Sequence, residues 1–151
     1  MSALRSIVRG VGSYLPARIM TNEELSRTID TSDEWIQQRV GIKQRHIAAD
    51  GEFTSDLAVH AARRALDDAR ISPDEIDLII VATSTPEDIY PSTACKIQNL
   101  LGATHAGAFD LSAACSGLRE RIANLAASDR LSSFAGYICA PSVSLSHQVY
   151  P

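Results

Sequence analysis

The residue with the clearest chemical potential is Cys115, which lies in a run of small residues. A short apolar segment ends at Ser112, and the following residues, SAACSG at 112–117, predict a tight turn with a helix beginning near the cysteine. A thiol at the start of a buried helix meets free N–H groups and the positive end of the helix dipole, which favour the thiolate. The small neighbours leave room for a substrate. This pattern is compatible with a nucleophile, although by itself it favours a buried, unreactive cysteine.

The other cysteines and the histidines are less informative. The chain has three cysteines, an odd number at wide spacings, which fits neither a disulfide framework nor a zinc site. All three are therefore expected to be free thiols, and Cys95 is expected to pack inside the protein. We assign no catalytic role to the four histidines, which are His46, His60, His105 and His147. The sequence predicts no metal site and no cofactor.

Several elements must position these residues, and three helix starts share one signal. Each has a hydroxyl residue followed three positions later by glutamate, the pattern of a capping box. The pairs are Thr21 with Glu24, Thr31 with Glu34, and Ser72 with Glu75, the last with Pro73 at the first helical position. They predict two short helices and a single helical turn.

The longer elements follow from hydrophobic periodicity. One apolar stripe predicts a helix over Thr54–Ala69, and the continuous apolar run Leu78–Ala82 predicts a strand covered on both faces. A helix is expected over Ser92–Leu101, a second buried strand over Ala108–Leu111, and a short strand over Ser6–Val11. Helices that alternate with buried strands predict an α/β layered fold.

The composition sets limits on the class of protein. The chain has 151 residues, of which 45% are hydrophobic and 21% are charged, as expected for one globular domain. Its formal net charge of -4 argues against a nucleic-acid partner, and no apolar run is long enough to span a membrane. Residues 1–15 lack the apolar segment of a secretory signal, so a cytoplasmic location is expected.

Four segments of the sequence together resemble a known family. They are GSYLP at 12–16, TSDEWI at 31–36, RVGIKQRHIA at 39–48 and FDLSAACSG at 109–117. In order and spacing they are similar to landmarks of β-ketoacyl-acyl carrier protein synthase III, a thiolase-fold condensing enzyme. The resemblance runs from Ile7 to Gly117, which would be the N-terminal part of such an enzyme.

The resemblance implies an acyltransferase that initiates fatty acid biosynthesis. Cys115 matches the family's nucleophile, which takes an acyl group from a short acyl-CoA. The acyl-enzyme then condenses with malonyl-acyl carrier protein in a Claisen condensation and releases carbon dioxide. Covalent storage of the acyl group divides one difficult step into two. The family also implies a homodimer, with acyl-CoA and acyl carrier protein as its partners.

Three further residues match substrate-binding positions of the family. Trp35 and Arg39 lie four residues apart and would share one helix face, where an indole can stack on the adenine of CoA and a guanidinium can hold the ring or a phosphate. The alternatives are a core anchor for Trp35 and a solvated helix charge for Arg39. Tyr90 matches a position that reaches across the dimer interface and limits the acyl pocket, and its alternative is a loop aromatic that covers the following helix.

The resemblance stops after Gly117. Leu118 is followed by Arg119, Glu120 and Arg121 where the family has a buried apolar helix, and unpaired buried ions there would cost several kcal/mol each. Read one nucleotide later, codons for residues 118–122 permit Phe-Ala-Asn-Ala-Leu, an apolar continuation. We therefore expect a family-like domain over residues 1–117 and an aberrant, frame-shifted tail over residues 118–151.

In the family, the catalytic histidine and asparagine come from the C-terminal half, so we expect the 151-residue chain to be inactive alone. Two alternatives stay open. The first is another thiolase-fold acyltransferase, such as a hydroxymethylglutaryl-CoA synthase or a polyketide-type ketosynthase. The second is a non-catalytic fragment that retains CoA binding or dimerisation.

Overall fold

The chain folds as an α/β protein whose residues fall into two compact units. The computed structural model describes residues 7–112 and 138–139. Of the described residues, 7–14, 53–112 and 138–139 belong to one unit, and 15–52 belong to the other. No helix among the described residues is long and apolar enough to cross a membrane.

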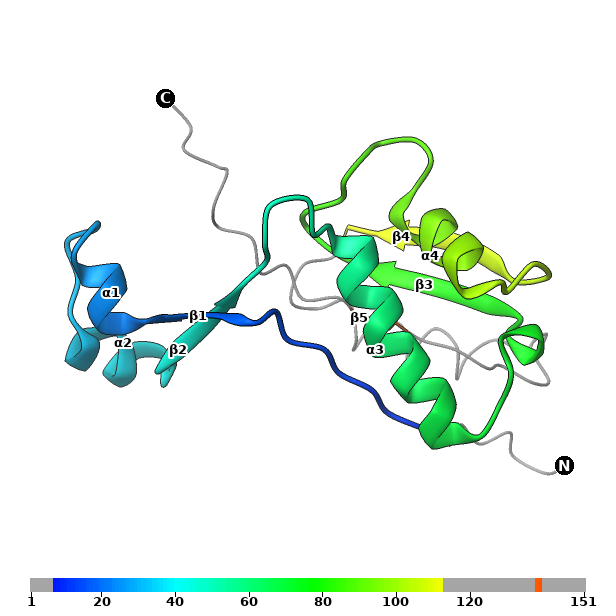
Figure 1. Ribbon diagram of the computed structural model, residues 1–151, viewed down its shortest axis with the longest axis horizontal. Coiled ribbons are helices and arrows are strands. Elements are labelled where there is room, and N and C mark those ends of the chain that lie inside the picture. Colours follow the sequence, from blue (N-terminus) through cyan, green and yellow to red (C-terminus); the bar gives the residue numbers. More distant parts are fainter. Residues whose placement is uncertain (1–6, 113–137, 140–151) are drawn as a thin grey trace, which may run out of the picture. The chain divides into compact units, whose positions relative to one another are not determined.

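The unit of residues 15–52 is a two-stranded ribbon that carries two helices (Figure 1). Strand β1 (Arg18–Thr21) pairs antiparallel with β2 (Gln44–Ile47). Helices α1 (Asn22–Ser26) and α2 (Asp33–Val40) lie between the two strands in sequence. The Thr21 hydroxyl accepts a hydrogen bond from the backbone N–H of Glu24 at 3.1 Å, which confirms the helix start predicted there.

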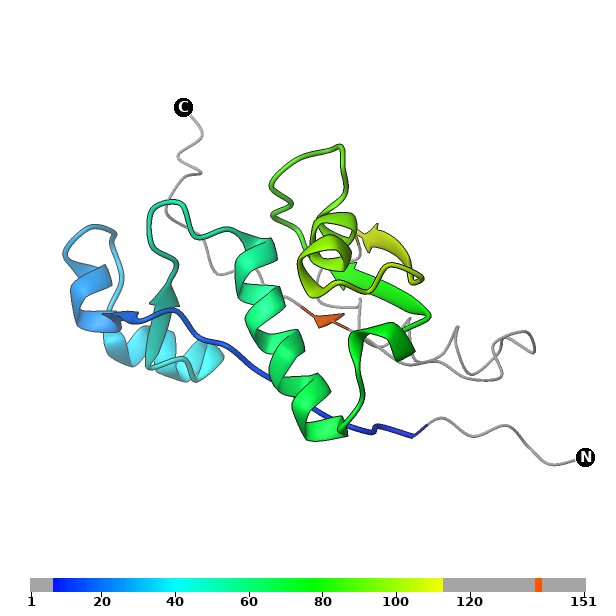
Figure 2. The ribbon, with the colours of Figure 1, turned by 45° about the vertical axis from the view of Figure 1, so that its right-hand side comes forward.

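The other unit contains a parallel sheet in the order β4-β3-β5 (Figures 1 and 2). Its elements are α3 (Thr54–Ala69), the 3₁₀ turn η1 (Pro73–Glu75), β3 (Leu78–Ala82), α4 (Thr93–Leu101), β4 (Gly107–Leu111) and β5 (Ile138–Cys139). The helix over Thr54–Ala69 and the strand over Leu78–Ala82 have the predicted bounds. Of the tail after Gly117, only β5 is described, and the aberrant-tail prediction otherwise lies outside the described residues.

The described part of the predicted strand Ser6–Val11 is not a strand, so that prediction is wrong. Residues 7–14 instead run alongside α3. Gly12 allows the chain to approach this helix closely, since a Cβ atom at this position would overlap the carbonyl oxygen of Ala61. The side chain of Ile7 is 79% exposed. Apolar alternation indicated a strand here, but close packing of glycine against a helix determines the path of the chain.

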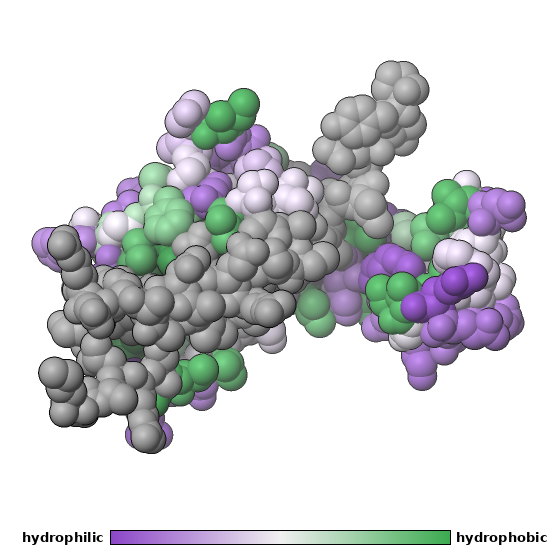
Figure 3. Space-filling model, turned by 180° about the vertical axis from the view of Figure 1, so that it is seen from behind, coloured by the Kyte–Doolittle hydropathy of each residue, from purple (hydrophilic) through white to green (hydrophobic). Residues whose placement is uncertain are grey.

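Two exposed segments border the sheet. Residues 83–92 connect β3 to α4, and Ile89 and Tyr90 in this loop are 82% and 88% exposed. Figure 3 shows hydrophobic surface at the tip of this loop. Strand β4 pairs only with β3 among the described residues, and its Phe109 is 43% exposed. The strand predicted over Ala108–Leu111 is confirmed as β4, but its predicted burial is wrong, because β4 forms an edge of the described sheet.

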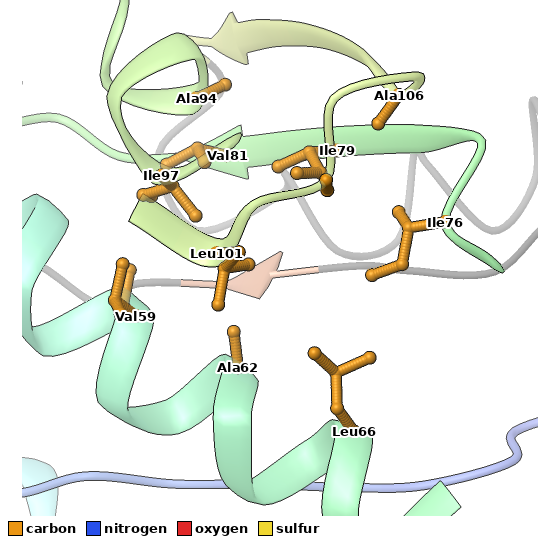
Figure 4. Packing of buried hydrophobic residues seen from close by; sticks show 12 residues of the cluster. Val59, Ala62, Leu66, Ile76, Ile79, Val81, Ala94, Ile97, Leu101 and Ala106 are labelled. Carbon is orange, nitrogen blue, oxygen red and sulfur yellow. The ribbon is translucent and has the colours of Figure 1, made fainter. Parts of the chain in front are cut away.

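The hydrophobic core of this unit lies between α3, α4 and the sheet (Figure 4). Alanines along α3, such as Ala58 and Ala62, allow α4 to approach closely. Ile79 and Val81 of β3 face them, and Ile97 of α4 is completely buried. The core therefore fixes α4 relative to β3, and with it the loop that joins them.

Candidate functional site

Helix α2 presents Trp35 to solvent. The Ser32 hydroxyl begins the helix by accepting a hydrogen bond from the N–H of Trp35 at 3.1 Å, and Gly41 ends it in the left-handed conformation at φ 71°. Ile36 is the one buried residue of this helix, whereas Trp35 is 57% exposed. A core anchor would be buried, so this exposure argues against that alternative for Trp35, and its substrate-binding role stays a prediction.

Arg39 lies one turn after Trp35 on the same face of α2. Its guanidinium carbon is 5.7 Å from the centroid of the indole ring, within the range of a cation–π interaction. This confirms that the two residues share a helix face, and it shows that Arg39 is more than an isolated solvated charge. Together they form an exposed aromatic surface with an adjacent positive charge.

Thr31 lies next to this pair, in a role that the sequence did not predict. The helix start was assigned to Thr31, but the capping residue is Ser32, one position later. The hydroxyl of Thr31 is consequently buried without a hydrogen-bond partner. Thr31, Ser32, Asp30 and Trp35 line an open cleft of about 420 Å³. An unpartnered buried hydroxyl beside an exposed indole is suited to binding a planar polar ligand.

A buried asparagine holds α2 in this position. Asn22 is 1% exposed, and its side-chain amide donates to Asp33 Oδ1 at 2.8 Å and to the carbonyl oxygen of Ile42 at 2.7 Å. Its Oδ1 accepts from Arg45 Nη1 at 2.8 Å. The amide thus ties both ends of α2 to β2, and no local sequence pattern had indicated this role.

Cys115, the predicted nucleophile, lies outside the described residues. Strand β4 is the last described element before Cys115. Asp110, five positions before Cys115 in sequence, connects this strand to α4. The Asp110 carboxylate accepts hydrogen bonds from the N–H groups of Thr93 at 2.8 Å and Ala94 at 2.7 Å, at the start of α4. The nucleophilic role of Cys115 therefore stays a prediction.

Tyr90 belongs to the loop between β3 and α4 and not to the unit that contains Trp35. Its side chain is 88% exposed, so it does not cover α4, and that alternative is wrong. The residues just before it are held by Lys96 of α4, whose Nζ lies 2.7 Å from Glu87 Oε2 and 2.6 Å from Asp88 Oδ2. Glu87 Oε1 also accepts the N–H of Ser55, at the start of α3, at 2.6 Å.

These contacts change the acidity of the charged groups. Burial of the Glu87 carboxyl raises its pKa, but the hydrogen bonds from Lys96 and Ser55 outweigh burial and lower the pKa below its ordinary value of 4.5. The carboxylates of Asp88 and Glu87 raise the pKa of Lys96. Glu87 and Lys96 are therefore both charged at neutral pH.

The lowered pKa of Glu87 predicts a pH dependence of stability. Its contribution to the free energy of unfolding is complete above pH 4.5 and is lost as pH falls through the lower pKa of the folded state. Urea unfolding between about pH 3 and 6 should therefore show a shallower loss of stability in Glu87→Gln than in the unchanged chain. Glu34→Gln removes the same charge at an exposed site and should keep the original slope. Equal slopes for all three proteins would contradict the prediction.

Of the remaining candidates, His46, His60 and Cys95 have described partners, and His105 is exposed. Nδ1 of His46 lies 2.7 Å from the carbonyl oxygen of Pro16, and His60 stacks on Tyr14 with ring centroids 4.7 Å apart. Cys95 is a free, partly buried thiol 3.3 Å from the Ser92 hydroxyl. Within residues 7–112, no group of three or more His, Cys, Asp or Glu side chains could hold a metal ion.

Comparison with known proteins shows one consistent relationship. No family model matches the chain. Over 113 residues, the chain is 58% identical to the β-ketoacyl-[acyl-carrier-protein] synthase III of Hyphomonas neptunium, and this match covers 75% of the chain and 35% of the relative. The chain thus spans about 35% of the length of the curated relatives that it matches.

Solved structures show the same relationship. The crystal structure of 3-oxoacyl-[acyl-carrier-protein] synthase III from Aquifex aeolicus VF5 is 49% identical with a TM-score of 0.72, and the match covers 77% of this chain and 37% of that one. The priming β-ketosynthase of the R1128 polyketide biosynthetic pathway is 44% identical with a TM-score of 0.73, over 79% and 36% of the two chains. In sequence and in its thiolase-like α/β fold, this chain therefore corresponds to one part of a β-ketoacyl-[acyl-carrier-protein] synthase III.

Proposed function

We propose that the chain supplies the acyl-CoA-binding and acyl-accepting part of a β-ketoacyl-acyl carrier protein synthase III. In the proposed reaction, the Cys115 thiolate attacks the thioester carbonyl of a short acyl-CoA and releases CoA as a thiol. The acyl-cysteine then condenses with malonyl-acyl carrier protein, which loses carbon dioxide. The enzyme would be an acyltransferase of the cytoplasm that initiates fatty acid biosynthesis.

The arrangement of Trp35, Arg39 and Thr31 carries this proposal. The exposed indole offers a stacking surface for the adenine of CoA, and Arg39, whose guanidinium lies over the ring, adds a positive charge that a nucleotide phosphate could bind. The buried Thr31 hydroxyl lacks a partner and could donate to an adenine ring nitrogen or accept from the exocyclic amine. The cleft lined by Thr31 and Trp35 would therefore receive the adenine, and Arg39, which neighbours Trp35 on the helix, would interact with the ring or a phosphate.

The proposal includes two macromolecular partners. The first is an acyl carrier protein, which the names of the curated relatives include and which would deliver the malonyl group. A second copy of the chain would complete a homodimer.

A second candidate function is the priming step of polyketide synthesis. It is favoured by the 44% identity to a priming β-ketosynthase of a polyketide pathway. The acyl-cysteine chemistry would be the same, and the acyl group and the carrier protein would differ. The rate of acylation of Cys115 by a series of acyl-CoAs, measured by mass spectrometry with Cys115→Ala as the control, would identify the preferred acyl group.

The adenine-binding role predicts a change in tryptophan fluorescence. Trp35 is the single tryptophan of the chain, so its emission reports only on this cleft. Titration with CoA should quench the emission, and Arg39→Ala should weaken the apparent affinity about tenfold, or ~1.4 kcal/mol. Gln38→Ala changes an exposed neighbour on the same helix and should leave the affinity unchanged.

Phosphopantetheine is the matched control ligand because it lacks the adenosine part of CoA. It should not quench Trp35 at concentrations that saturate with CoA. Quenching of equal size by both ligands, or no response to CoA, would show that the indole does not bind adenine and would return Trp35 and Arg39 to a structural role.

A further inference from the structure

The loop between β3 and α4 has an exposed apolar tip, and the residues directly before that tip are fixed by charged and polar contacts. Ile89 and Tyr90 are among the most exposed large apolar side chains in the described part of the chain, at 82% and 88%, and Figure 3 shows the hydrophobic surface at this tip. A solvent-exposed apolar tip gains little from packing, and such loops usually have low local stability. The residues immediately before the tip are nevertheless fixed by several charged and polar contacts.

The loop is fastened to two helices. On the α3 side, the Thr54 hydroxyl donates to the carbonyl oxygen of Thr85 at 2.9 Å, and the N–H of Ser55 donates to Glu87. On the α4 side, the ammonium of Lys96 lies between the carboxylates of Glu87 and Asp88. The last of these contacts is at Asp88, directly before Ile89. The fixed part of the loop therefore ends where the exposed tip begins.

Lys96 is the one charge that compensates both carboxylates in this cluster. The side chain of Glu87 is 8% exposed, and Asp88 is its neighbour in sequence. Without the ammonium of Lys96, the adjacent carboxylates of Glu87 and Asp88 would repel each other. The Glu87 carboxylate would also stay buried, with the N–H of Ser55 as its remaining described partner. The favourable response would be for the loop to swing outward and hydrate Glu87. Lys96 is not part of the hydrophobic core, so this response would leave α4 in place.

We infer that Lys96 is a positioning residue for Tyr90, whose loop it holds in a fixed place through Glu87 and Asp88. The consequence for chain-length selectivity rests on the proposed function and on the family resemblance, by which Tyr90 reaches across the dimer interface and limits the acyl pocket. A fixed tyrosine excludes long acyl groups, whereas a mobile one yields to them. Selectivity would therefore depend on an ion-pair cluster that touches no substrate.

The first experiment measures order in the loop of the complete chain by NMR. In Lys96→Gln, the amide of Ser55 should exchange with solvent about tenfold faster, and the order parameters of the Ile89 and Tyr90 amides should fall from about 0.85 toward 0.6. Lys96→Arg keeps the charge and should restore both values. The N–H of Ala94, which donates to Asp110, should not change in any variant.

Lys43 supplies the matched control, because it is the only other lysine in the chain and it is exposed. Lys43→Gln removes the same charge and should leave the loop as it is. An unchanged loop in Lys96→Gln would overturn the inference, and so would the same loosening in Lys43→Gln, since the effect would then be one of net charge.

The second experiment measures acylation of Cys115 by acetyl-CoA and hexanoyl-CoA. Lys96→Gln should lower the ratio of the acetyl to the hexanoyl rate about fivefold, in the direction of Tyr90→Ala, while Lys96→Arg keeps the original ratio. A merely structural role would lower both rates equally and would contradict the link to selectivity. If the unchanged chain accepts neither acyl group, the proposed function fails for this polypeptide, and the NMR result still decides whether Lys96 positions the loop.

Discussion

Mixed with acetyl-CoA and malonyl-acyl carrier protein, the 151-residue chain should form no β-ketoacyl product by itself. Condensation requires the acyl-accepting thiol together with a histidine and an asparagine that stabilise the developing negative charge. The chain spans about 35% of the length of its curated relatives, and the resemblance assigns that histidine and asparagine to no residue here. Loss of a single oxyanion donor costs about 2.7–4 kcal/mol, or roughly a hundred- to a thousandfold in rate.

His46 and His60, two of the three described histidines, do not offer a replacement. His46 is held at the carbonyl oxygen of Pro16, and His60 is stacked on Tyr14. The assay is product formation scored by mass spectrometry, with Cys115→Ala as the control. Turnover that disappears in Cys115→Ala would contradict the prediction, because this chain or a partner polypeptide would then have to supply the missing groups.

The acyl-transfer half of the reaction is separable from condensation. It needs the thiol and bound acyl-CoA, so an acyl adduct on Cys115 without any condensation product would fit the proposed function. Absence of an adduct would favour the alternative of a non-catalytic fragment. The two steps thus distinguish a protein that has lost one part of the chemistry from one that retains none of it.

The elements that periodicity determines were predictable from the sequence. The stripe of alanines and leucines over Thr54–Ala69 and the apolar run Leu78–Ala82 gave the correct bounds of α3 and β3. In both segments, local preference and burial favour the same structure. The single turn after Ser72 was also predicted, because the N–H of Ser72 does donate to Glu75 Oε1, at 2.9 Å, as a capping box requires.

Elements that depend on distant neighbours were not predictable. The segment before Gly12 has the alternation of a strand, but its path follows α3, which no local pattern encodes. Strand β4 has apolar residues typical of a buried strand, yet its exposure depends on whether another strand pairs with its outer edge. The start of α2 was misplaced by one residue because Thr31 and Ser32 are both good capping residues.

In the candidate site, too, some residues were predictable from the sequence and others depend on contacts between distant segments. Trp35 and Arg39 were found because the resemblance marked them and their spacing placed them on one helix face. Thr31 became a candidate only when the structure left its hydroxyl without a partner. Asp110, Asn22 and Lys96 act through contacts between segments far apart in sequence, so sequence patterns gave no signal for them.

Ile97→Ala should lower the free energy of unfolding by about 3–4 kcal/mol, within the range measured when a large buried side chain is cut to alanine. Ile97 is 0% exposed and lies between α3 and the sheet, where Figure 4 shows it beside Val81. The loss combines apolar surface that is no longer buried with a cavity that alanine cannot fill. Typical domains are stable by about 5–15 kcal/mol, so much of the total would disappear.

Leu100→Ala is the matched control, because Leu100 lies on the same helix and is 46% exposed. It removes a similar side chain and should cost less than about 1 kcal/mol. Urea unfolding followed by far-ultraviolet circular dichroism measures both variants, since Trp35 lies in the other unit and does not report on this core. Equal losses in the two variants would mean that α4 does not pack on α3 and β3 in solution, and the placement of Lys96, Asp110 and the Tyr90 loop would fail with it.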